Sequence, residues 1–163
     1  MEIDDLMILT DDQIDYTSLS DDTLQELALG EELFMATSAL VQLATINKSL
    51  AAVVAEDILS HSKGDRYLQA TAIETLFGLD KGRAIEYLLE AVPEESDSYI
   101  LNAIAELVIE NRSDFQSGMG GRVFRLLWPK IKSSNGEEID RTVRNSFLNM
   151  YNERAIAVGE NVG

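Results

Sequence analysis

The strongest constraint on the fold is a helix-length segment that occurs twice, with an offset of 32 residues. Residues 65–78 read DRYLQATAIETLFG, and residues 97–110 read DSYILNAIAELVIE. Identical residues occupy three matching positions: Asp65 and Asp97, Tyr67 and Tyr99, Glu74 and Glu106. Between the copies, residues 80–92 form a second apolar helix pattern, and Ser96 or Asp97 is expected to cap the second copy. A helix, a short turn and a helix at this period are typical of a helical solenoid.

An earlier copy of the same helix lies 33 residues before the first. Its apolar residues align with those of the first copy: Phe34 with Tyr67, Ala39 with Ala72, Leu40 with Ile73 and Leu43 with Leu76. Elsewhere the apolar residues also recur with helical spacing, and no pair of segments alternates as paired strands would. The sequence therefore predicts an all-α fold, a short α-α solenoid of about eight helices.

The length of 163 residues suits one domain with a sizeable core. We predict a single helical-repeat domain over residues 1–163. Within it, residues 1–16 are a lead whose order the sequence leaves open, residues 17–110 are acidic repeats, and residues 111–163 are a basic-leaning C-terminal cap.

Charge is distributed unevenly along the chain. The formal net charge is −16, with 23 acidic and 5 basic residues in 1–110 and 6 acidic and 8 basic residues in 111–163. Such acidity repels phosphate backbones and anionic lipids, so it argues against nucleic acid and membrane as partners. It favours a basic protein partner. The alternative is that the acidity only keeps the protein soluble.

Three further features bear on location. The chain has no cysteine, and residues 1–30 contain no Lys or Arg, unlike the basic start of a signal peptide. The apolar runs are far shorter than the roughly 18 residues that a membrane span needs. These features predict a cytoplasmic protein.

Capping residues and breakers predict several helix ends. Ser20 should cap a helix that Gly30 closes in the left-handed conformation. Residues 116–121 should form a break in the helical pattern. A short basic helix over residues 122–128 should follow it and stop near Pro129.

The segment YLQATAIETLFGLDKGRAIEYLLEAV, residues 67–92, resembles the HEAT-like repeats first described in phycocyanobilin lyases. In those repeats, a helix ending in an Ala-Leu-Gly-like turn leads through an Asp-containing corner to a helix ending in Leu-Leu. The corner here is residues 77–80, Arg66 matches the usual Arg, and the usual Pro is absent. The resemblance covers about residues 31–110. It implies a HEAT-like α-α solenoid in which the repeated helices line the concave face.

No catalytic constellation emerges from the residues. His61 is the single histidine, and its place near a helix end suggests that it caps backbone carbonyls. With one His and no Cys, transition-metal sites are not expected. Residues 118–121 either seat an anion on backbone N–H groups or form a loop before a helix, and they lack the P-loop lysine. We expect no enzyme activity, no metal and no cofactor.

A basic set of residues lies in the C-terminal third: Arg122, Arg125, Lys130, Lys132, Arg141 and Arg144. Such a set can indicate nucleic-acid binding. Because it follows a strongly acidic segment, we expect these residues to balance acids of neighbouring helices.

The repeated helix carries the candidate binding residues. At about 100° per residue, Tyr67 and Glu74 share one face, and Tyr99, Glu106 and Glu110 share the matching face of the second copy. Stacked repeats would align these faces as a ladder of tyrosine and carboxylate. Tyrosine is enriched at interface hot spots, and acids select a basic partner. The alternative is that the tyrosines fill gaps between repeats and the glutamates are simply solvated.

As a whole, the chain resembles the small, acidic, cysteine-free, all-helical immunity proteins of contact-dependent growth inhibition and related polymorphic toxin systems. This resemblance implies a non-catalytic inhibitor that occludes the active site of a toxin domain, often a basic nuclease. Two alternatives stay open. One is a HEAT-like scaffold or adaptor for another protein, and the other is a bilin-lyase-like enzyme, which the lone His and the absence of Cys disfavour.

Overall fold

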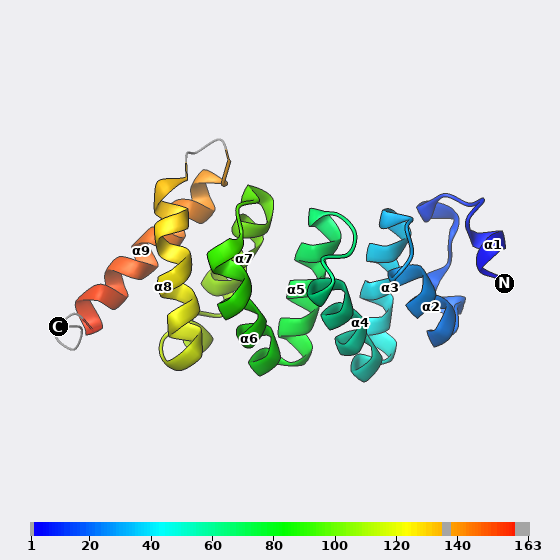
Figure 1. Cartoon of the computed structure of the whole chain (residues 1–163), viewed down its shortest axis with the longest axis horizontal. Coiled ribbons are helices and arrows are strands. Elements are labelled where there is room, and N and C mark those ends of the chain that lie inside the picture. The colour runs from blue at the N-terminus through cyan, green and yellow to red at the C-terminus, as the bar shows by residue number, and fades with distance from the viewer. Residues whose placement is uncertain (1, 135–137, 159–163) are drawn as a thin grey trace. The chain divides into compact units, whose positions relative to one another are not determined.

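The structure is a computed structural model that describes residues 2–134 and 138–158, with side chains through Met150. In these ranges the chain is helical and contains no strand, so the predicted all-α class is confirmed. The α-helices follow one another along the chain (Figure 1) as α1 Ile3–Leu6, α2 Asp21–Ala28, α3 Leu33–Ile46, α4 Lys48–Ser60, α5 Arg66–Leu79, α6 Lys81–Ala91, α7 Ser98–Glu110, α8 Gly118–Ser133 and α9 Arg141–Val158. Short 3-10 turns join some of them: η1 Asp11–Gln13, η2 Tyr16–Ser18, η3 Val92–Glu94 and η4 Arg112–Phe115. None of the described helices combines the length and the apolarity that a membrane span requires.

The chain divides into two compact units, Met1–Lys81 and Gly82–Gly163. The boundary falls at the start of α6. Each unit has a core of its own, and the single solenoid over the whole length stays a prediction.

The first unit is built around α3, which packs against α2, α4 and α5. Helix α4 also packs against α5. The buried side chains are mostly aliphatic and come from all four helices, among them Leu24, Leu40, Leu43, Ile58 and Leu76. Burial of apolar surface, worth about 25 cal/mol per Å², therefore holds these helices together.

The N-terminal ends of α3 and α5 lie side by side. Gly64, in the turn before α5, has φ +72, and a Cβ there would lie 3.2 Å from Cδ2 of Leu33 and 2.6 Å from Cδ2 of Leu68. The positive φ favours glycine at this position, and a Cβ would also require the two leucine side chains to shift. The turn brings the first residue of α3 against the start of α5.

Residues 2–16 are folded onto this unit. Leu6 of α1 and Ile14 are buried, and η1 begins with a capping box between Thr10 and Gln13. Residues 2–16, whose order the sequence did not predict, therefore form a series of short helical turns held by two buried apolar side chains.

Several predicted caps are confirmed. The side chain of Ser20 accepts a hydrogen bond from the backbone N–H of Thr23, and Asp97 accepts from the N–H groups of both Tyr99 and Ile100. The expectation for Gly30 is wrong, because glycines with positive φ in the described residues are Gly64 and Gly118. Helix α2 instead closes with a bond from the N–H of Gly30 to the carbonyl of Leu27.

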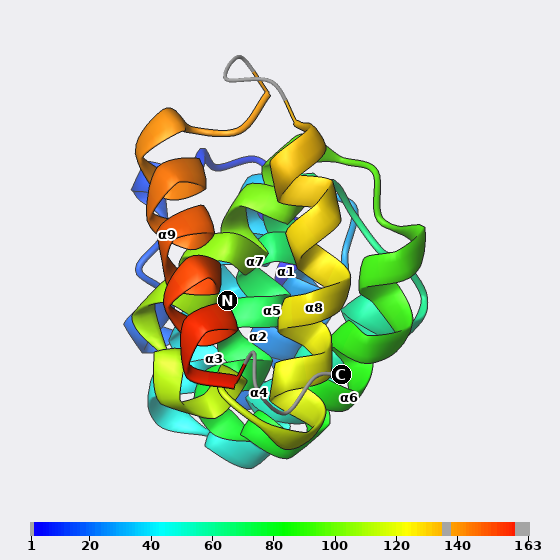
Figure 2. The same ribbon diagram turned by 90° about the vertical axis from the view of Figure 1, so that its left-hand side faces the viewer.

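In the second unit, α8 and α9 pack against α7 and against each other (Figure 2). The rings of Phe124 on α8 and Phe147 on α9 are fully buried, with centroids 4.9 Å apart and planes tilted by 31°. Phe115 of η4 and Leu127 complete the centre of this core. The aromatic pair thus joins α9 to α8, in addition to the packing of α9 on α7.

Helix α8 differs from its predicted extent at both ends. It begins at Gly118 rather than after a loop over residues 116–121, and it continues through Pro129 to Ser133. Pro129 is exposed while Leu127 and Ile131 on either side are buried. The core contacts on both sides of Pro129 therefore outweigh the helix hydrogen bond that its ring cannot donate.

Replacement of Asp97 by Ala is expected to lower the free energy of unfolding by about 1 kcal/mol, because two N–H groups of α7 lose their acceptor. Urea unfolding followed by the fluorescence of Trp128, the single tryptophan, measures this in the second unit. Asp97→Asn is the control, since Asn also caps helices well. An equal loss for both variants would show that the charge, and not the cap, matters.

Candidate functional site

The face of α5 that carries Tyr67 and Glu74, called the α5 stripe below, is exposed to solvent. Tyr67 is 48% exposed and Glu74 is exposed, while Leu68, Ala72 and Leu76 on the opposite side are buried. The stripe thus has the orientation that the helical spacing predicts.

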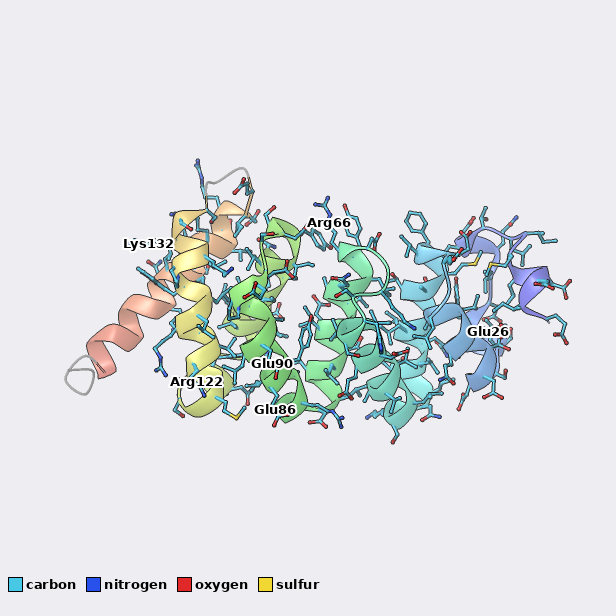
Figure 3. All side chains as sticks on the ribbon, in the orientation of Figure 1. Glu26, Arg66, Glu86, Glu90, Arg122 and Lys132 are labelled. Atoms are coloured by element: carbon cyan, nitrogen blue, oxygen red, sulfur yellow. The ribbon has the colours of Figure 1, made fainter. Side chains whose placement is uncertain are left out.

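Tyr67 is held by its neighbour Arg66, which lies at the start of α5 (Figure 3). The guanidinium carbon of Arg66 lies 5.1 Å from the centroid of the Tyr67 ring, and its NH2 group donates a 3.2 Å hydrogen bond to the tyrosine hydroxyl. This contact restricts the ring and shows that its face accepts a cation.

The matching face of α7, called the α7 stripe, is exposed in two separate parts. Tyr99 is 41% exposed, and Glu106 and Glu110 are exposed. Ala103, between them on the same face, is buried at 8% exposure. The tyrosine and the glutamates of α7 are therefore separated by a covered position.

Glu106 and Glu110 line an open groove between α7 and α9 with a volume of about 210 Å³. The other lining residues are Ile109, Thr142, Val143 and Ser146. The groove combines two carboxylates, two hydroxyls and two apolar side chains. Such a lining fits the methylene stem and the charged end of a Lys or Arg side chain.

Sequence reasoning missed the α9 side of this groove. Thr142 and Ser146 are four residues apart and flank Val143, so their spacing alone places them on one helix face. The spacing did not reveal that this face meets α7.

The predicted ladder pairs residues of different units. Tyr67 and Glu74 belong to the first unit, and Tyr99, Glu106 and Glu110 belong to the second. The structure brings Glu106 and Glu110 together in one groove. The alignment of the α5 and α7 stripes stays a prediction.

The basic residues of the second unit have backbone partners that the sequence did not suggest. The ammonium of Lys130 donates to the carbonyls of Pro93 and Glu95 at 3.0 and 2.7 Å. Arg144 donates to the carbonyl of Lys132, whose own ammonium lies 4.6 Å from the centre of the Trp128 ring. These side chains tie loops and helix ends together. For Lys130 and Arg144, the expected role of balancing acids is therefore replaced by a structural one.

Arg122 and Lys132 lie near opposite ends of α8 (Figure 3). The bases of this helix are thus spread along its length.

His61 takes the predicted capping position. It follows α4, and its Nδ1 lies 3.1 Å from the carbonyl oxygen of Asp57 and 2.8 Å from the Asp57 carboxylate. Lys63 contacts the same carboxylate at 3.2 Å. The histidine is therefore part of the turn after α4.

Among the described residues, no group of three or more acidic or histidine side chains is arranged to hold a metal ion. At the start of α8, a Cβ on Gly120 would lie 1.9 Å from the carbonyl oxygen of Asp114, whereas no atom lies within 4 Å of a Cβ built on Gly118.

Two tyrosines outside the α5 and α7 stripes have raised pKa values. Burial raises the pKa of Tyr16, and the hydrogen bond to Asp11 and the charge of that carboxylate raise it further. Burial, with a smaller effect from the Glu95 carboxylate, also raises the pKa of Tyr87. Both phenols therefore stay neutral at physiological pH, and the Tyr16 hydroxyl donates a hydrogen bond to the Asp11 carboxylate.

Comparison with models of known families, with curated protein sequences and with solved structures found no match to this chain.

Proposed function

We propose that this protein binds a basic protein partner and performs no chemistry of its own. The observation that carries the proposal is the same in both units. A helix that buries its apolar face in the core presents a tyrosine and one or two glutamates on the opposite face. Tyrosine supplies a large apolar contact with few rotatable bonds, and the carboxylates supply charge complementarity.

The charge of the chain supports this proposal. A net charge of −16 attracts a basic protein over several ångströms and raises its rate of association at low salt. The α7–α9 groove offers Glu106 and Glu110 to a single Lys or Arg side chain. The groove is therefore the expected site of an ion pair at the interface.

The most specific form of the proposal is an immunity protein that covers the active site of a secreted toxin, such as a basic nuclease domain. An acidic surface with projecting tyrosines is suited to the positively charged cleft in which a nuclease holds phosphate. In this role the protein is a cytoplasmic inhibitor that competes with the substrate.

A tagged pull-down from the native organism at low and high salt tests the proposal. Recovery of one basic polypeptide in equal amount, whose enzymatic activity falls when the protein is added back, supports the inhibitor. Several unrelated proteins that dissociate at high salt would favour an adaptor. Retention of a coloured small molecule without a protein would overturn the proposal in favour of a bilin-handling enzyme.

The double variant Glu74→Lys/Glu106→Lys should bind the recovered partner at least about tenfold more weakly, because two attractive contacts become repulsive. Its affinity should also depend less on salt concentration. Isothermal titration at two salt concentrations measures both effects.

Glu26→Lys/Glu90→Lys is the matched control. It changes one exposed glutamate in each unit, on α2 and α6, and alters the net charge by the same amount (Figure 3). Equal weakening by the two double variants would mean that only the total charge matters and that the stripes are not the binding site.

A further inference from the structure

Helix α3 carries a stripe that matches the stripe of α5 position by position. With an offset of 33 residues, Phe34 corresponds to Tyr67, Ser38 to Thr71, Val41 to Glu74 and Thr45 to Gly78. On α3, Phe34 and Thr45 are exposed, Ser38 is half-buried, and Val41 is 52% exposed. Unlike the α5 and α7 stripes, these two belong to one unit.

The α3 and α5 stripes begin at the same end of two neighbouring helices. The helices pack against each other, and Gly64 sits between Leu33 of α3 and Leu68 of α5. Phe34 follows Leu33 directly, and Tyr67 directly precedes Leu68. Two aromatic side chains therefore project from adjacent helix starts.

The exposure of Phe34 is unusual for its residue type. Its side chain is 82% exposed, although phenylalanine is normally among the most buried residues. The core of the first unit is complete without it, because the buried face of α3 consists of Met35, Ala36, Ala39, Leu40 and Leu43. Aromatic residues are enriched at protein interfaces relative to the rest of the surface.

Besides Arg66, which lies on the Tyr67 ring, the exposed charges on these two helix segments are carboxylates. Glu31 and Glu32 immediately precede α3, Glu74 lies two turns after Tyr67 on the α5 stripe, and all three are exposed. Residues 1–81 contain 16 acidic and 4 basic residues, a net charge of −12. A ligand of this surface must therefore be both apolar at its centre and positively charged around it.

We infer that Phe34 and Tyr67 form the anchoring centre of a docking surface for a basic protein segment. An apolar side chain of the segment packs on the two rings, and its Lys or Arg side chains face Glu31, Glu32 and Glu74. The inference rests on the proposed function and deepens it, since it names the surface and the kind of segment that binds there. Phe34, which was not among the binding residues predicted from the sequence, becomes the principal anchor.

A random 12-residue peptide library displayed on phage and selected against the immobilised full-length protein provides the probe. We expect the selected peptides to carry a net positive charge and at least one large apolar residue. Fluorescence anisotropy with the tightest selected peptide should show an affinity about tenfold lower for Phe34→Ser than for the unchanged protein.

Val53→Ser is the matched control, because Val53 is 60% exposed on α4 of the same unit. Its affinity for the peptide should stay within about twofold of the unchanged protein. Circular dichroism melts of both variants check that the fold is intact, as expected for exposed positions.

The outcomes separate the inference from the proposed function. Basic peptides that bind Phe34→Ser as well as the unchanged protein would overturn the α3–α5 surface and leave the proposed function standing. Selection of acidic or uncharged peptides would overturn both. Self-association of the unchanged protein that Phe34→Ser abolishes, seen by sedimentation, would make a second copy the occupant and overturn the inference.

Discussion

Replacing Phe147 by Ala is expected to lower the free energy of unfolding of the second unit by about 3–5 kcal/mol. The Phe147 ring is fully buried and lies against Phe124, 4.9 Å away between centroids. The substitution leaves a cavity between α8 and α9 and removes the aromatic contact between them. Urea unfolding followed by Trp128 fluorescence reports this loss, because Trp128 lies on α8 in the same unit.

Phe34→Ala is the control for the same chemical change. Because the Phe34 side chain is 82% exposed, its removal should alter the stability of the first unit by no more than about 0.5 kcal/mol. Circular dichroism at 222 nm measures this. A loss of several kcal/mol for Phe34→Ala would show that its ring supports the fold and would remove the basis for its role as an anchor.

Gly120→Ala is expected to destabilise the second unit by about 3 kcal/mol. A Cβ at this position would lie 1.9 Å from the carbonyl oxygen of Asp114 and 3.1 Å from the Cα of Phe115. Both are backbone atoms of η4, so no side-chain rotation relieves the overlap. The start of α8 must move away from η4, which also disturbs the buried Phe115 ring.

Gly78→Ala is the matched substitution in another helix. Gly78 is exposed in α5, and no atom lies within 4 Å of a Cβ built there. Alanine should therefore stabilise the first unit by up to about 1 kcal/mol through its higher helix propensity. The two glycine variants should change the urea midpoint in opposite directions. A higher urea midpoint for Gly120→Ala would contradict the close contact between Gly120 and η4, and a lower midpoint for Gly78→Ala would contradict the open space at Gly78.

The sequence was sufficient for the helices whose ends are set by local chemistry. Ser20 and Asp97 cap their helices as their residue types predict, and the apolar period locates the buried faces of α5 and α7. These features depend on interactions within a few residues. A single sequence contains that information.

The start of α8 and its continuation through Pro129 could not be predicted, because tertiary contacts determine both. Gly118–Gly121 and Pro129 are helix breakers by propensity, yet all lie inside one helix. Close packing of Gly120 on η4 and burial of Leu127 and Ile131 overcome the local preference. These contacts join residues of different structural elements, and the spacing of residues within one helix does not predict them.

The candidate site was predicted one helix at a time. The faces of Tyr67 with Glu74 and of Glu106 with Glu110 are exposed as the helical spacing indicates. The partners of those faces were not predictable. Thr142 and Ser146 reach Glu106 and Glu110 only because α9 folds back onto α7. Phe34 and Tyr67 lie at the starts of neighbouring helices only because α3 packs on α5.

The division of the chain at the start of α6 gives each unit its own tyrosine and glutamate stripe. If the proposed partner engages both stripes, its two contacts belong to one chain, and the second contact forms at a higher effective concentration than it would on a separate molecule. Weak individual contacts then combine into a slowly dissociating complex. Loss of either stripe then removes the gain from double attachment as well as the contact itself. A substitution in one stripe is therefore expected to weaken binding of the partner by more than it weakens binding to that stripe alone.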